Sequence, residues 1–300
     1  MNEPSNTAEP APKKERRDLL NRIWAVAALG MASGSATFLA CGGGSGGQTT
    51  AVATGAAAGP GPAPGADPAA PPAPSSPPPP PPPAPGTAPA LGAHKLSFNR
   101  DEVSTPALVA SGLSTRASGS TLLACVGRGL FSADIPTDSA GNAFVQLGES
   151  HTYALWPKSG TALFACEKAQ GMAGHVVSVV KPIITDETTM SVVEVTGGGL
   201  VRDVQWREVL SGQPLTSASV TTTGPAMLVA WWWGDAGVEE NKTAVADNGF
   251  TVIHSILESG SLVQCAVAAR QVSAAGTYNV TWTATPQQGA QLWLVAVQAG

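Results

Sequence analysis

Two apolar stretches about 100 residues apart decide the fold: GSTLLACVGRG at Gly119–Gly129 and GPAMLVAWWWG at Gly224–Gly234. Around both stretches, from residue 94 onward, apolar and polar residues alternate with a period of two, and turn residues recur about every ten positions. No apolar pattern of helical period lasts three turns in this region. The sequence therefore predicts an all-β domain over residues 94–300.

Further matches follow in the same order along the two parts of this domain. They are DSAGN at Asp138 with DNG at Asp247, SGTALFAC at Ser159 with SGSLVQCA at Ser259, GHVVSVV at Gly174 with GTYNVTW at Gly276, and TMSVVEV with QLWLVAV. We predict an internal repeat with halves at about 94–199 and 200–300, which together build a jelly-roll-like sandwich of two sheets. Two separate sandwiches in tandem are the alternative.

These motifs, together with VVEVTGG in the first half and LTSASVTTTGPAMLVA, NGFTVI and VSAAGTYNVTWTA in the second, resemble jelly-roll modules of secreted and surface proteins of environmental bacteria. The resemblance spans Ser97 to Gln298, and its motifs are turns and core strands. It implies the fold, and it carries over no activity and no catalytic residue.

Residues 1–41 have the features of an export signal. Basic residues precede the apolar stretch Ile23–Ala40, and glycines follow Cys41. The tetrapeptide FLAC ending at Cys41 resembles the lipobox of bacterial lipoproteins, and ERRDLLN at Glu15–Asn21 resembles the twin-arginine export motif. We expect lipid on Cys41 and an exported, membrane-anchored protein of the cell envelope, facing periplasm or exterior. General secretion and an uncleaved membrane helix are the alternatives.

Residues 42–93 have the composition of a tether. Most of the 26 prolines fall between Pro60 and Pro89, including an unbroken run over Pro77–Pro83, and Asp67 is the only charged residue between Pro60 and Pro89. Such a segment has too little apolar surface to offset the entropy of ordering. We therefore predict a disordered spacer between the signal and the β domain.

Charge and cysteine content narrow the classes of function. Five of the 16 basic residues precede the tether, which leaves 11 basic against 16 acidic residues from residue 94 onward, so the β domain is mildly acidic within a formal net charge of −5. It has no basic stripe, which excludes nucleic acid as the expected partner. Three cysteines follow the tether, Cys125, Cys166 and Cys265, each in an apolar run. We expect buried thiols, with a Cys125–Cys166 disulfide as the alternative.

The residues give no metal or cofactor signature. The four histidines lie far apart in the sequence, with no cysteine or carboxylate at ligand spacing, so we predict no zinc site and no cofactor. Asp134, Asp138 and Asp247 are weak calcium candidates, because oxygen-bearing turns can bind this ion. The same residues are equally explained as turn formers.

The tryptophan run is the strongest candidate for a binding surface. Strand alternation sends Met227, Val229, Trp231 and Trp233 to one face and Leu228, Ala230 and Trp232 to the other. The first half has Val126, Gly127 and Arg128 at the three tryptophan positions. We name Trp232, Trp233 and Trp156 as a candidate platform for sugar rings or an apolar partner. The alternative is that the three rings of the run fill core space on both sides of a central strand.

Taken together, the sequence favours a non-catalytic surface module with an adhesive or ligand-binding role, with a glycan or another envelope component as its ligand. An enzyme is the first alternative, with a site assembled from Asp134, Asp138, Glu149 and His151. A purely structural envelope module is the second.

Overall fold

The computed structural model describes residues 88–100 and 103–299, which form strands and loops and contain no helix. The all-β prediction is confirmed. Among these residues there is accordingly no helix long and apolar enough to span a membrane. The predicted export signal, its Cys41 and the predicted tether up to residue 87 lie outside the described residues.

Eighteen strands are described, eight of them in the first half of the domain. These are β1 (Ala90–Asn99), β2 (Ala107–Ser114), β3 (Ser118–Arg128), β4 (Thr137–Asp138), β5 (Val145–Tyr153), β6 (Trp156–Gln170), β7 (Ala173–Val180) and β8 (Thr188–Thr196). The second half contains β9 (Gly199–Val209), β10 (Leu215–Thr216), β11 (Val220–Thr222), β12 (Ala226–Asp235), β13 (Val245–Ala246), β14 (Thr251–Ile256), β15 (Val263–Val272), β16 (Gly276–Tyr278), β17 (Thr281–Thr283) and β18 (Ala290–Ala299).

The two halves have the same strand order. The large sheet of the first half runs β1-β8-β3-β6-β5, and its small sheet runs β2-β7-β4. In the second half β9-β18-β12-β15-β14 form the large sheet, while β10-β17-β13 and β11-β16 cover it. The large-sheet order, with β2, β7 and β4 opposite, follows a jelly roll. The domain is thus built from two similar halves, as predicted, but each half closes its own sandwich, so the expected single pair of sheets is replaced by two sandwiches packed against each other.

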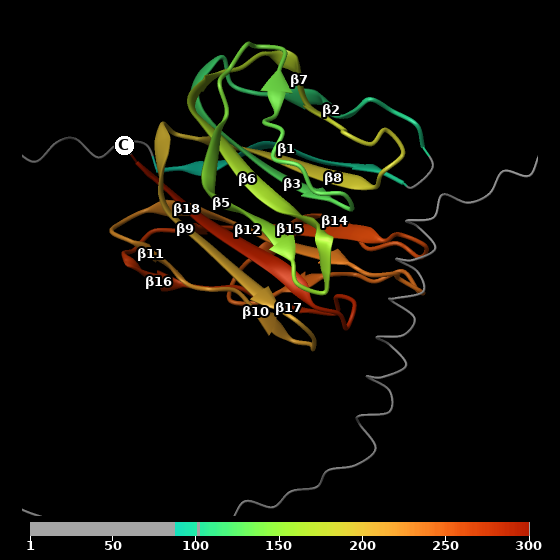
Figure 1. Ribbon diagram of the computed structural model, residues 1–300. Helices are drawn as coiled ribbons and strands as arrows, with labels where there is room; N and C mark the ends of the chain where they lie inside the picture. The colour runs from blue at the N-terminus through green and yellow to red at the C-terminus, as the bar shows by residue number, and fades with distance from the viewer. Residues whose placement is uncertain (1–87, 101–102, 300) are drawn as a thin grey trace, which may run out of the picture. The chain divides into compact units, whose positions relative to one another are not determined.

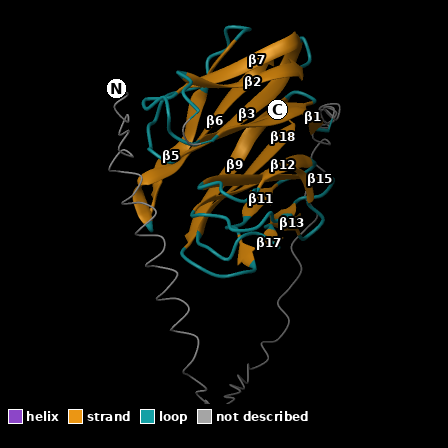
Figure 2. Cartoon of the chain, turned by 90° about the vertical axis from the view of Figure 1, so that its right-hand side faces the viewer, coloured by secondary structure: helices purple, strands orange, loops and turns teal. Residues whose placement is uncertain are grey.

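The sheets stack in layers, with the two large sheets innermost (Figure 1; Figure 2). One cluster of buried side chains fills the space inside the first half and another fills the second half. A third cluster, which we call the central core, lies between the two large sheets and joins the halves. Among its residues are Leu96, Leu123, Cys125, Leu163, Val193, Met227, Val229, Trp231, Trp233, Cys265, Trp293 and Val295.

Strand β12 contributes to two cores at once. Met227, Val229, Trp231 and Trp233 enter the central core, as the alternation predicts, and the intervening residues enter the second-half core. Both faces of the strand are covered, because its own small sheets lie on one side and the first half lies on the other. This explains why β12 is apolar at nearly every position.

Two buried side chains of β18 add polar links across the central core. The Nε1 of Trp293 donates to the hydroxyl of Thr161 on β6 at 2.8 Å. That hydroxyl donates in turn to Oε1 of Gln291 at 2.6 Å. At the other end, Oε2 of Glu187, just before β8, accepts from the backbone N–H groups of Leu262 and Val263. These bonds fix the register of one half against the other, because each would leave a buried group unpaired if broken.

A small residue on β3 makes room for a large one on β12. A Cβ atom added at Gly127 would lie 1.9 Å from Nε1 of Trp233, which is a severe overlap. Gly127 pairs with Thr189 on β8, and Trp233 pairs with Gln291 on β18. Thr189 and Gln291 are the first residues of the matched segments TMSVVEV and QLWLVAV, so their partners occupy equivalent positions in the two halves. The structural counterpart of Trp233 is therefore Gly127, one position from the Arg128 that the sequence comparison indicated.

The domain starts earlier than predicted. Strand β1 begins at Ala90, and its first residues pair with the end of β8. The amide of Ala93 donates to Oε2 of the buried Glu194 at 2.9 Å, and Gly92 leaves room for that carboxylate. The last four residues of the predicted tether segment thus belong to the sheet.

We expect Gly127→Ala to lower the free energy of unfolding by about 1–3 kcal/mol, because the new methyl group overlaps the Trp233 indole. Gly224→Ala is the matched control, since an added Cβ there meets nothing within 4 Å. Chemical denaturation of the two variants measures the difference. Equal stability of Gly127→Ala and the wild type would show that the halves do not pack as described.

We also expect a chain ending at Gly199 to be insoluble or unfolded. Without the second half, the first-half side of the central core, including Leu123, Leu163 and Val193, is exposed to water. Solubility and a thermal melt of this truncated chain provide the measurement. A soluble product with a sharp unfolding transition would instead identify the first half as an independent domain.

Candidate functional site

The predicted tryptophan platform is not on the surface. Trp232 and Trp233 are 0% exposed and Trp156 is 8% exposed. Trp233 and Trp156 lie in the central core, and Trp232 lies in the second-half core. The rings fill core space on both sides of a central strand, so they offer no face to a ligand. The sequence could not show this, because tertiary packing supplies the covering layers: the opposite half covers Trp233 and Trp156, and the small sheets of the second half cover Trp232.

The calcium candidates do not converge. Asp138, with a fully buried side chain, accepts from the backbone N–H of Asn142 at 2.8 Å, as a turn former does. Asp134 bonds the nearby Ser132 hydroxyl, and Asp247 is exposed in the turn after β13. Among the residues that the structure describes, no three His, Cys, Asp or Glu side chains are grouped to hold a metal ion.

The residues named for the enzyme alternative have different surroundings. His151, on β5, stacks on Trp206 of β9, with ring centroids 3.7 Å apart and planes 7° from parallel. Asp138, on β4, pairs instead with His175 of β7. Asp138, one of the three carboxylates named with His151, is therefore committed to another histidine.

Asp138 belongs to a buried chain of polar side chains. His175 contacts the Thr115 hydroxyl through Nδ1 at 2.8 Å and Oδ2 of Asp138 through Nε2 at 2.9 Å. An activated nucleophile in an enzyme has the same arrangement, in which an imidazole base contacts the hydroxyl and a carboxylate orients the imidazole. Here, however, His175 is 0% exposed, and the Thr115 hydroxyl accepts from the amide of Met172 at 3.0 Å. The chain ties β2, β4 and β7 together and presents no nucleophile to solvent.

The three described cysteines are free, buried thiols, as expected. The alternative Cys125–Cys166 disulfide is wrong. Cys125 points into the central core, whereas Cys166 belongs to the core of the first half. The two side chains therefore lie on opposite faces of one sheet.

The second half carries an open pocket at the corner where β13, β15 and β16 come together. Its volume is about 430 Å³. The lining residues are Asn248, Gly249, Arg270, Thr277, Tyr278 and Asn279. None of them is acidic, and they include a guanidinium, a phenol ring and two side-chain amides.

An Asn-Gly turn forms one wall of the pocket. Asn248 and Gly249 have φ angles of 59° and 76°, a conformation that asparagine and glycine adopt most readily. A Cβ atom at Gly249 would lie 3.3 Å from Nε of Arg270, so glycine also leaves room for the guanidinium. The motif DNG is visible in the sequence, but nothing there indicates that Arg270 lies against it.

The guanidinium of Arg270 is held in a fixed orientation. Its Nη1 donates to the carbonyl oxygen of Asn248, and its Cζ lies 5.0 Å from the ring centroid of Tyr278. The Tyr278 hydroxyl donates to the carbonyl of Ala274 at 2.9 Å, which fixes the ring. Asn248 Nδ2 donates to Oδ1 of Asn279 at 2.9 Å. The pocket is therefore organised before any ligand arrives.

The same corner of the first half is filled. There the turn after β4 is closed by Asp138 and Asn142, and the Asn142 side chain exchanges hydrogen bonds with the backbone of Gln170. His175, which matches Thr277 in the sequence comparison, fills the interior. The second half has Thr277 and the exposed Asn248 in this region. One half thus has a closed network where the other has a pocket.

Histidines lie at both edges of the contact between the halves. His94 of β1 meets His254 of β14, with ring centroids 4.8 Å apart. The pKa of His94 is lowered by burial and, secondarily, by His254. Burial also lowers the pKa of His151, against the opposing effect of Glu149. The folded protein therefore favours the neutral form of both side chains.

Comparisons with protein-family models, with curated proteins and with solved structures found no match in any of the three. The resemblance to bacterial jelly-roll modules therefore stays a prediction.

We expect the protein to lose thermal stability as the pH falls from 7.5 to 5.5. His94 and His151 have folded-state pKa values below the unfolded value of about 6.5, so the unfolded chain takes up protons first. Their stabilising effect is present above pH 6.5 and declines as the pH falls towards the folded pKa values. In the double variant His94→Asn/His151→Asn, the slope of melting temperature against pH should be shallower. An unchanged slope would assign the pH dependence to other groups.

Proposed function

We propose that the protein is an exported, lipid-anchored, non-catalytic surface module that binds carbohydrate carrying carboxylate groups. The observation that supports this proposal is the second-half pocket. It combines one oriented guanidinium, one aromatic ring and two amides, with no acidic residue in its lining. These are the groups that recognise an anionic, hydroxyl-rich ligand.

The chemistry of each group fits such a ligand. A guanidinium presents a planar fork of N–H donors that matches a carboxylate, and Arg270 uses Nη1 on Asn248, which leaves the rest of the fork available. Asn248, Asn279 and the exposed Thr277 provide amide and hydroxyl groups for sugar hydroxyls. The open, shallow form of the site suits a segment of a long chain.

The surface location rests on the sequence. A signal-like N-terminus, the lipobox-like Cys41 and a proline-rich segment would carry the β domain away from a membrane. A module displayed in this way meets envelope and extracellular polysaccharides. The adhesive role follows from an anchor at one end of the chain and a binding site at the other.

The structure favours binding over catalysis. Among the candidate residues of the enzyme alternative, Asp138 pairs with His175 and not with His151, and the hydroxyl–imidazole–carboxylate chain that it belongs to is buried. A purely structural envelope module would have no use for a preorganised polar pocket. If the protein binds no acidic glycan, the purely structural role is favoured instead.

We expect the full chain to bind polygalacturonate and not the neutral polysaccharide dextran. Arg270→Gln should weaken the binding by about 10- to 100-fold, the range for loss of a charge-assisted hydrogen bond. Arg202→Gln, on the exposed side of β9, is the control with the same change of charge and should bind normally. Affinity electrophoresis at two salt concentrations provides the measurement.

The binding proposal is contradicted if the wild type fails to be retarded by polygalacturonate. It is also contradicted if the Arg270 and Arg202 variants lose affinity equally, since that result would reflect net charge instead of a defined site. Thermal melts of both variants show that any loss of binding is not a loss of folding.

A further inference from the structure

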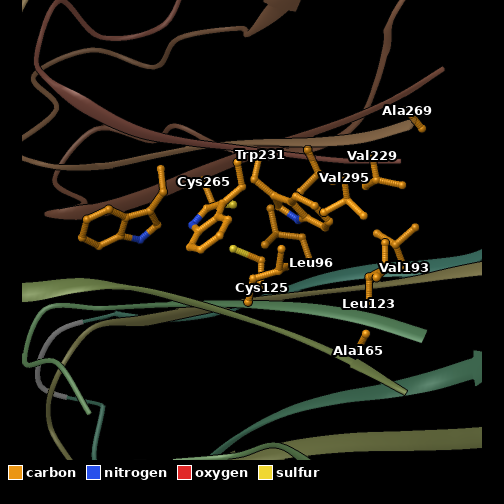
Figure 3. Close-up of a cluster of buried hydrophobic side chains, with 14 of the residues drawn as sticks. Leu96, Leu123, Cys125, Ala165, Val193, Val229, Trp231, Cys265, Ala269 and Val295 are labelled. Atoms are coloured by element: carbon orange, nitrogen blue, oxygen red, sulfur yellow. The ribbon is translucent and has the colours of Figure 1, made fainter. Parts of the chain in front are cut away.

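Two cysteines from different halves of the domain face one another in the central core. Cys125 lies on β3, in the middle of the first large sheet, and Cys265 lies on β15, in the second large sheet. Both side chains belong to the central core, and β3 packs against β15. Figure 3 shows the two sulfur atoms pointing toward each other from opposite sheets.

We propose that Cys125 and Cys265 form a disulfide that links the two halves when the protein folds in an oxidising environment. The link would join the central strand of one large sheet to the second strand of the other. Formation in the cell rests on export of the unfolded chain by general secretion, because disulfides persist in oxidising compartments and are rare in the cytosol. The pairing itself depends only on the geometry of the folded domain.

The third described cysteine is excluded from this pair by its position. Cys166 points into the first-half core, and its Sγ contacts the carbonyl oxygen of Glu167 at 3.8 Å. It is therefore separated from the central core by the thickness of a sheet. The fold selects one pairing among three cysteines, and the sequence alone could not do so.

The surroundings suit a structural cross-link. Trp231 and Leu96 lie beside the two cysteines in the central core (Figure 3). In antibody-type β-sandwiches a tryptophan packs in the same way against a disulfide that joins two sheets. Both cysteines are 2% exposed, so a bond formed there would be shielded from reductants in solution.

The reaction requires a disulfide oxidant, such as oxidised glutathione or a thiol–disulfide oxidoreductase. The thiolate of one cysteine attacks the oxidant, forming a mixed disulfide and releasing one oxidant thiol. The second thiolate attacks the mixed disulfide and releases the other oxidant thiol. Overall, two protein thiols become one disulfide, and the oxidant is reduced to two thiols that take up the two protons.

The bond should form during folding and not in the closed protein. Burial raises the pKa of both thiols, and each is sealed between the sheets. In the closed protein the two thiols are seldom ionised and an oxidant cannot reach them, so they do not react. While the halves are still coming together, the thiols are accessible and the order of strands already brings them into proximity.

The test uses the full chain carrying Cys41→Ser, which leaves three thiols. The protein is unfolded under reducing conditions and refolded with a mixture of oxidised and reduced glutathione. We expect peptide mapping without reductant to find Cys125 joined to Cys265, and Cys166 free. The same linked peptide should appear in the Cys166→Ser variant and be absent from Cys125→Ser and Cys265→Ser.

The oxidised protein should melt on the order of 10 °C above the reduced protein, because the link closes a long loop in the unfolded chain. This difference should disappear when a reductant is added. The proposal is overturned if the refolded Cys41→Ser chain, with or without the further change Cys166→Ser, keeps Cys125 and Cys265 as thiols. A bond between Cys125 and Cys166 would overturn it equally. None of these outcomes depends on glycan binding by Arg270.

Discussion

The structure depends on the burial of one face of each large sheet against the other. A five-stranded sheet has two faces, and the small sheets of each half, one in the first and two in the second, cover only one of them. The remaining faces are apolar, with Leu123 and Leu163 on one and Val229 and Trp231 on the other. Leaving them in water would cost about 25 cal/mol for each Å² of apolar surface. The halves therefore complete each other, although each closes its own sandwich.

This constraint explains the composition of the central strands. In a sandwich with one wet face, residues alternate between apolar and polar, whereas β12 is buried along its entire length. The tryptophans of β12 are explained in the same way. Trp233 is large because Gly127 opposite it is small, and the pair makes a contact that neither half could make alone.

Much of the fold could be predicted from sequence because it rests on local patterns. Alternation gave the correct face for Met227 and for each tryptophan of β12, and the matched segments gave the two halves. What covers each face is a question of tertiary packing, so the predicted tryptophan platform was wrong. The pocket escaped detection for the same reason: Arg270 and Tyr278 are unremarkable singly and meet Asn248 only when β13, β15 and β16 converge.

The two equivalent corners differ, and in a single chain substitutions can accumulate at one of them without altering the other. Two identical units assembled as a symmetric dimer would carry the same corner twice, so every substitution would act at both places at once. A single chain has no such restriction. One corner can keep its Asp138–His175 network as a rigid support, while the other can accept substitutions that alter what its Arg270 pocket holds. Because both halves belong to one chain, the residues that maintain the assembly differ from those that are free to diversify.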